Sequence, residues 1–184
     1  MDLDLSLLLL RLALGPMLVA HGANKIFGSG GLAGTTSWFS SLGLRPARLH
    51  ALMAAVSELT AGTLLTLGLL TPVACAAFVG LMAVATMTDH RGKGYFVFKG
   101  GCEYTLLVAT AAVALAISGP GSWSVDHALG LSDLAGAWWG LGAALVGLGA
   151  AAALLVAAYR PTATARHRDD PERREDEPRA QTYL

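Results

Sequence analysis

The chain has 184 residues, of which 54% are hydrophobic and only 14% charged, which excludes an ordinary water-soluble globule. Thirteen Lys and Arg balance thirteen Asp and Glu, so no excess of positive charge points to nucleic acid. The two cysteines, Cys75 and Cys102, lack the CxxC spacing of a redox pair or a zinc site. Neither a metal centre nor a thioredoxin-type site is therefore predicted.

Five apolar stretches predict transmembrane helices, because at about 1.5 Å per residue each reaches or nearly reaches the roughly 30 Å hydrocarbon thickness of a bilayer. They cover residues 3–23, 51–70, 72–88, 101–118 and 137–159. The first has an acidic N-terminal flank and is predicted to be a retained helix, not a signal peptide. Thr71-Pro72 predicts a tight turn within an antiparallel hairpin, because proline cannot continue a helix past its missing N–H.

The expected fold is an all-α membrane protein, with a four-helix transmembrane bundle over residues 1–130 and an additional C-terminal fifth transmembrane helix over residues 131–160. Residues 161–184 hold arginine and acidic side chains in near balance with three prolines, which predicts a disordered charged tail. Trp38, Phe39 and Leu42 lie in a run of Ser and Thr and indicate a short interfacial or re-entrant helix.

The basic residues fall on alternate sides of the predicted spans. Lys and Arg occur in the first loop, the third loop and the tail, whereas the N-terminus, the 71–72 turn and residues 119–136 have none. Only Arg11 lies inside a span. The positive-inside rule therefore predicts a multi-pass protein with its N-terminus outside and its C-terminus in the cytoplasm.

A few ionisable residues interrupt or end the apolar stretches. A charge at the centre of a membrane helix costs about 2.5–3.5 kcal/mol, so each needs a partner or a purpose. His21 and Lys25 end the first span, and Glu58 lies within the second. His90 follows the third span and Glu103 opens the fourth, after two glycines that allow close approach of backbone or ligand. Antiparallel helices bring all five to the predicted cytoplasmic end, where they are candidate ligand-binding residues.

Glu58 is the deepest of these side chains. Small residues at positions 54, 55, 61 and 62 surround it one turn away, so it should face the helix bundle, where Arg11 or His21 could pair with it. Arg11 joins the candidate set for this reason. A purely structural ion pair is as compatible with Arg11 and Glu58 as a functional role is. Lys25 and the other basic residues that flank the spans also fit topology signals that contact phospholipid. No catalytic residue is assigned.

Four blocks of sequence resemble the DoxX family of small bacterial membrane proteins. The first comprises RLALG at 11–15 and HGANKIFG at 21–28, and the second comprises Glu58, Ala61-Gly62 and LGLLTPVA at 67–74. The third is GGCEY at 100–104, and the fourth is GPGSWSVD at 119–126. The resemblance covers residues 5–130 and implies a four-helix core in the bacterial inner membrane. The helix after residue 130 departs from the family pattern.

The resemblance also implies a function, because relatives include the small subunit of thiosulfate:quinone oxidoreductase and members linked to thiol and superoxide stress. The leading hypothesis is an integral membrane subunit of a redox complex, quinone-linked or acting in thiol or sulfur oxidation and oxidative-stress defence. His21 and Glu58 would donate to or protonate quinone oxygens, and Lys25 and Arg11 would favour anionic reduced forms. The chain has no haem or flavin signature, so electrons would come from a quinone, bound but not covalent, or from a partner redox protein.

Two other functions remain open. A membrane scaffold would recruit cytoplasmic enzymes through the basic loops and tail, with the polar cluster only fixing helix register. A small-solute carrier would use Glu58 as its protonatable group, but the absence of an inverted repeat argues against it. The small-xxx-small pairs Gly136/Gly140 and Ala143/Gly147 permit either homo-oligomerisation or packing onto the four-helix core.

Overall fold

The computed structural model describes residues 1–131 and 133–161, and within them it is helical, with one isolated β-bridge between Leu44 and Tyr159 and no strand. This confirms the all-α prediction, whereas the predicted tail lies outside the described residues. The elements in chain order are α1 (Asp2–Phe27), α2 (Gly31–Leu42), α3 (Ala47–Leu67), α4 (Thr71–Thr88), the 3-10 helix η1 (Val97–Lys99), α5 (Glu103–Ser118), α6 (Val125–Ala128) and α7 (Ala137–Ala158).

Four of the helices are long and apolar enough to cross a membrane, namely α1, α3, α4 and α7. The apolar helix α5 has only 16 residues, which at about 1.5 Å per residue gives roughly 24 Å, short of a roughly 30 Å hydrocarbon core. The structure thus has four candidate spans and one shorter apolar helix among the described residues, where the sequence predicted five spans. The short helix predicted around Trp38 is confirmed as α2.

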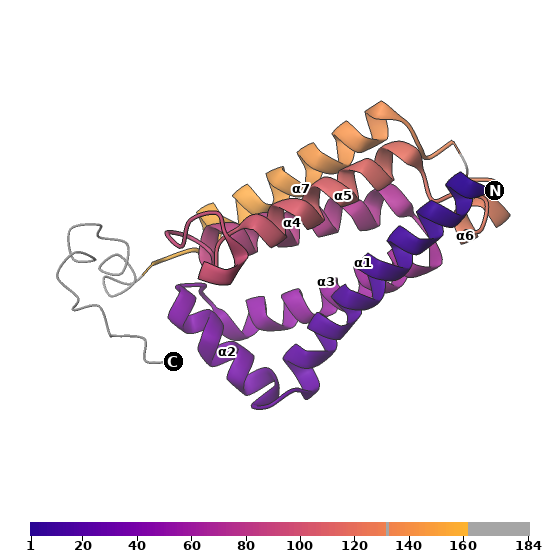
Figure 1. The fold of residues 1–184 in the computed structure, drawn as a ribbon. Coiled ribbons are helices and arrows are strands. Elements are labelled where there is room, and N and C mark those ends of the chain that lie inside the picture. The colour runs from indigo at the N-terminus through magenta and orange to yellow at the C-terminus, as the bar shows by residue number, and fades with distance from the viewer. Residues whose placement is uncertain (132, 162–184) are drawn as a thin grey trace, which may run out of the picture.

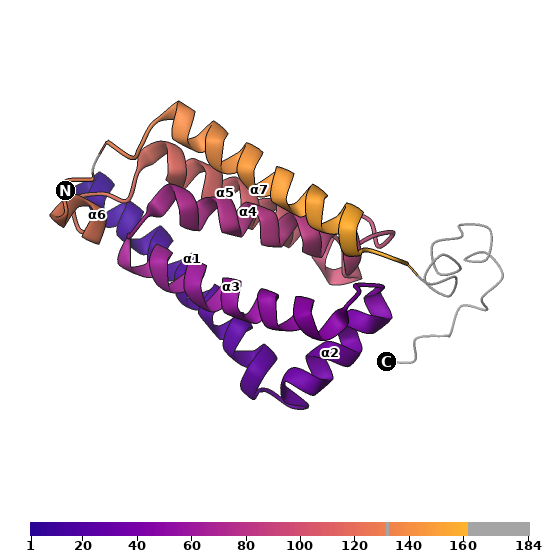
Figure 2. The ribbon, with the colours of Figure 1, turned by 180° about the vertical axis from the view of Figure 1, so that it is seen from behind.

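The helices form two groups, one of α1, α2 and α3 and the other of α4, α5 and α7 (Figures 1 and 2). The predicted hairpin joins them: α3 ends at Leu67, Gly68 takes a positive φ of 64°, and α4 begins at Thr71 with proline in its first turn. This turn lies beside α6 at what we name the α6 end. The groups diverge toward the opposite end, named the α2 end (Figure 1).

Glycine allows the close helix crossings within each group. A Cβ on Gly22 of α1 would lie 2.9 Å from the Ala55 carbonyl oxygen of α3. A Cβ on Gly147 of α7 would lie 2.5 Å from the Ala76 carbonyl oxygen of α4. The small residues of α7 that the sequence left open to either role, Gly140, Ala143 and Gly147, are buried, and α7 packs on α4 and α5. In this chain they serve packing onto the core.

Buried polar groups fix the α6 end. Asp126, at 0% exposure, accepts hydrogen bonds from the Leu70 N–H at 2.8 Å, the Thr71 N–H at 3.0 Å and the Thr71 hydroxyl at 2.8 Å. These donors begin α4, where a carboxylate is favoured by the unpaired N–H groups and the helix dipole. The Ser124 hydroxyl caps α6 itself by accepting from the His127 N–H at 3.2 Å. The loop after α5 is thereby tied to the turn between α3 and α4.

Arg11 belongs to this same end, which corrects the expectation that it could pair with Glu58. Its side chain, only 1% exposed, donates to the Thr66 carbonyl at 3.2 Å and to the Trp123 carbonyl at 2.5 Å. Arg11 lies about four turns of α1 before Lys25, so it cannot reach the α2 end. Its contacts join α1 to the end of α3 and to the loop before α6.

All other described Lys and Arg residues lie at the α2 end, in keeping with the charge pattern of the sequence (Figure 1). They occur where α1 ends, around the start of α3, between α4 and α5, and after α7. They are Lys25, Arg45, Arg48, Arg91, Lys93, Lys99 and Arg160.

Candidate functional site

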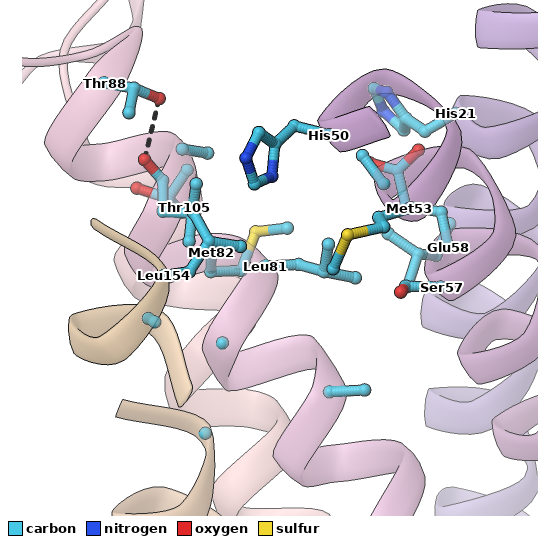
Figure 3. A pocket seen from close by; sticks show the side chains of 18 of the residues that line it. His21, His50, Met53, Ser57, Glu58, Leu81, Met82, Thr88, Thr105 and Leu154 are labelled. Carbon is cyan, nitrogen blue, oxygen red and sulfur yellow. Dashed lines mark hydrogen bonds between the residues drawn. The ribbon is translucent and has the colours of Figure 1, made fainter. Parts of the chain in front are cut away.

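A pocket of about 640 Å³ opens between the two helix groups, and α1, α2, α3, α4, α5 and α7 all line it. Its walls are mainly aliphatic, with Met53, Leu81, Met82 and Leu154 labelled in Figure 3. Polar side chains from several elements gather toward the α2 end of the pocket. The size lies within the roughly 300–1,000 Å³ of small-molecule sites, and an apolar wall with few polar groups is their usual character.

The central polar feature is an ion pair between α1 and α3. Lys25 Nζ donates to both carboxylate oxygens of Glu58, at 2.8 and 2.7 Å. The two side chains are only 13% and 10% exposed. Gly22, one turn before Lys25, lets α1 approach α3 closely at this point. A Cβ on Gly22 would lie only 3.0 Å from the Glu58 Cβ. Glu58 therefore faces the bundle as predicted, and its partner is Lys25.

Both predicted histidines line the pocket with this pair. His21 lies one turn before Lys25 on α1 and shares the Glu58 side of the pocket (Figure 3). His90 follows α4 and its Nδ1 lies 2.6 Å from the Gly100 carbonyl oxygen. A carbonyl only accepts, so Nδ1 carries the proton in this bond and Nε2 of the neutral ring is an acceptor. The structure thus brings His21, Lys25, Glu58 and His90 to one pocket.

Glu103 stands outside the pocket, contrary to its selection as a ligand candidate. Its carboxylate accepts from the Val97 N–H at 2.9 Å, and its own N–H donates to the Tyr95 carbonyl. The close approach expected at the preceding glycines is real but involves backbone, since a Cβ on Gly101 would lie 2.5 Å from the Gly94 carbonyl oxygen. Glu103 therefore shapes the loop before α5, and its neighbours Tyr104 and Thr105 line the pocket instead.

His50 is a pocket residue that the sequence analysis did not select. It lies in the first turns of α3, its side chain is 9% exposed, and its ring is directed into the pocket (Figure 3). Nε2 is 3.2 Å from the Arg45 carbonyl oxygen, whereas Nδ1 is buried and has no hydrogen-bond partner in the described part of the chain. The helical spacing could have identified His50 as a pocket residue. It precedes Ser57 and Glu58 by about two turns and so lies on a face next to theirs.

Comparison with protein families gives a match over the first half of the chain. The family model described as DoxX covers residues 6–91, which span α1 to the residues just after α4. The matched part contains His21, Lys25, His50, Glu58 and His90, whereas the resembling blocks after residue 100 lie beyond it. No curated protein and no solved structure gives a significant match to this chain.

Proposed function

Because this chain belongs to the DoxX family through residues 6–91, we propose that it is a membrane subunit of a redox complex that binds a quinone headgroup in the α2-end pocket. The observation that supports this proposal is the Lys25–Glu58 ion pair beside His21 on the wall of a largely apolar pocket. A quinone supplies two-electron, two-proton redox chemistry when bound, and this chain would supply the binding site.

The residues present fit such a headgroup. A quinone ring is flat and apolar, with two carbonyl oxygens that accept hydrogen bonds. Methionine and leucine side chains form the walls, and Trp38 and Phe39 of α2 also line the pocket. Lys25 and His21 bring polar hydrogen-bonding groups to its α2 end. A cavity of about 640 Å³ is large enough for the ring and part of its tail.

The ion pair gives each side chain a defined task. Lys25 carries three N–H donors, of which two bond Glu58, so the carboxylate orients the ammonium group at the pocket wall. Glu58 also offsets the positive charge and reduces the cost of burying it. His21 lines the pocket on the same side as the Glu58 carboxylate, and in this proposal it exchanges a proton with a headgroup oxygen.

The proposal includes an orientation. The α2 end holds every described Lys and Arg except Arg11, so the positive-inside rule puts that end, with the pocket, at the cytoplasmic face of the bacterial inner membrane. The N-terminus would then lie outside. Electrons would come from a partner redox protein that approaches from the cytoplasm or within the membrane.

The test measures decylubiquinone reduction with sulfide or dithiothreitol as donor, in membrane vesicles that contain the complex. We expect Glu58→Gln and Lys25→Met to lower the rate by about tenfold or more at subsaturating quinone, because each breaks the ion pair at the site. Glu103→Gln is the matched control, since this acid lies near the same end but outside the pocket. Its rate should equal that of the wild type.

Two results would contradict the proposal. Equal rates for the wild type and both pocket variants, each shown to be folded, would exclude a quinone site at the ion pair. If removal of residues 162–184 abolished the activity or phenotype while Glu58→Gln had no effect, the scaffold function would be favoured instead.

A further inference from the structure

The pocket is long, and one face of α4 forms much of its length. The lining residues on this face recur every three or four positions and so lie in a single stripe. They are Val73, Ala77, Gly80, Val84 and Thr88. The 15 steps from Val73 to Thr88 correspond to roughly 22 Å, more than the roughly 15 Å of one hydrocarbon leaflet. The pocket thus extends from the polar α2 end along most of α4.

A second stripe, on the neighbouring helix α7, completes this apolar channel. Val146, Ala150 and Leu154 lie four residues apart and all line the pocket. The channel therefore has aliphatic side chains on two helices and is continuous with the polar end that holds His50 and Glu58. A polar head joined to a long hydrocarbon chain matches this division of surfaces, because each part of the molecule would meet groups of its own polarity.

His50 indicates which polar head fits. Nε2 donates to the Arg45 carbonyl, so in the neutral ring Nδ1 has no proton and can only accept. This Nδ1 is buried beside the pocket with no partner among the described residues, and an unpaired buried acceptor is costly. A ligand hydroxyl would pair with it. An oxidised quinone offers only acceptors, whereas the reduced form carries two hydroxyl donors.

We propose that the pocket binds a long-tailed quinol, with one headgroup hydroxyl donating to His50 Nδ1 and the tail lying along the pocket-lining stripes of α4 and α7. This inference rests on the proposed function and adds the redox form of the ligand and the place of its tail. His50 is a binding residue in this arrangement, and the ion pair remains on the other side of the headgroup.

The headgroup contact is tested by calorimetric titration of the purified full chain in detergent with decylubiquinol, kept reduced under argon. His50→Gln keeps a donor at the Nε2 position for the Arg45 carbonyl but removes the Nδ1 acceptor, whereas His50→Asn keeps an acceptor near Nδ1. We expect His50→Gln to weaken decylubiquinol binding about 3- to 10-fold and His50→Asn to retain most of the affinity. Binding of oxidised decylubiquinone should be unchanged in His50→Gln. The reverse order of the two variants, or no effect of His50→Gln, would overturn the contact.

The tail position is tested with a pair of variants on α7. Ala150→Phe fills the channel from a lining position, whereas Ala152 is exposed and does not line the pocket, so Ala152→Phe is the matched control. Ala150→Phe should weaken decylubiquinol by roughly tenfold or more, and it should leave the tail-free quinol of the same ring unaffected. Decanol, a tail without the ring, should not bind measurably.

The outcomes separate this inference from the proposed function. If the wild type binds tailed and tail-free quinols equally and Glu58→Gln abolishes both, the quinone site stands and the tail channel is wrong. If decanol binds as tightly as decylubiquinol, the pocket is a general lipid crevice and the headgroup assignment is wrong. If the wild type binds no quinone or quinol, the proposed function fails and this inference fails with it.

Discussion

The ion pair between Lys25 and Glu58 can be tested for its structural role apart from its role in binding. The side chains are 13% and 10% exposed and meet through two hydrogen bonds of 2.8 and 2.7 Å. Removing one partner of a buried pair costs about 3–5 kcal/mol, because the other charge stays buried without compensation. Lys25 lies in the last turn of α1 near the α2 end, where water can enter, so we expect Lys25→Met to cost about 2–4 kcal/mol.

The complete double-mutant cycle gives a sharper expectation. Glu58→Gln keeps an amide oxygen that can accept from Lys25, so its cost should be about 1–2 kcal/mol. The double variant Lys25→Met/Glu58→Gln leaves no charge at the site and preserves side-chain volume, so it should lie within about 1 kcal/mol of the wild type. The coupling energy between the two positions should therefore be about 2–6 kcal/mol, the summed cost of the single variants less that of the double variant.

Cys75 supplies the assay, because its thiol is fully buried in the helix core and becomes reactive only on unfolding. Thermal unfolding in detergent would be followed with a thiol-reactive dye in a Cys102→Ser background. At about 2–4 °C per kcal/mol for a chain of this length, Lys25→Met should lower the melting temperature by about 4–16 °C. Lys93→Met is the control, since its pair with Asp89 has side chains 44% and 32% exposed and contributes about 0–1 kcal/mol. Equal shifts for Lys25→Met and Lys93→Met, or additive costs in the cycle, would refute this reasoning.

Three further outcomes are expected. Asp126→Ala should destabilise the protein by about 3–5 kcal/mol, because three hydrogen bonds to the start of α4 are lost, and Asp133→Ala, on an exposed side chain, should shift the thermal unfolding by less than about 2 °C. Gly22→Val should separate α1 from α3 and cost about 2 kcal/mol or more in dye-monitored unfolding, whereas Gly142→Ala, with no atom within 4 Å of its added Cβ, should be neutral. A cysteine introduced at Lys93 should react with an impermeant maleimide only after the cells are opened, and labelling of intact cells would reverse the proposed orientation.

Much of the helix pattern could be predicted from the sequence, because helix length and helix ends depend on neighbouring residues. Apolar length defined the spans, and Thr71-Pro72 defined the hairpin, so the predicted bounds lie within a few residues of α3 and α4. The partner of Glu58 could not be predicted in the same way. Arg11, His21 and Lys25 all lie on α1, and which of them meets Glu58 depends on how α1 and α3 are offset along their length, which Gly22 fixes through its contact with Ala55.

His50 was missed for a different reason. It lies at the beginning of an apolar stretch, where a histidine is most simply interpreted as a boundary residue. Only the divergence of the two helix groups turns that boundary into the wall of a pocket, and this divergence depends on packing between segments far apart in the chain. Glu103 was selected for the opposite reason, because its glycine neighbours suggested room for a ligand, but the space they create is filled by the backbone of residues 94–95.

The two polar clusters of this bundle resemble each other in sequence, since each combines a cation on α1 with an acid from a later element. They differ in which groups donate hydrogen bonds to the carboxylate. Asp126 receives its three hydrogen bonds from the backbone and side chain at the start of α4, so its oxygens cannot change partners without unfolding that helix end. Glu58 receives its hydrogen bonds from one flexible lysine at the wall of a pocket. A lysine side chain can turn toward a ligand at modest cost, so exchange of partners is feasible only at the α2 end. The cluster at the α6 end therefore serves the fold, and this difference supports the proposed binding site at the α2 end.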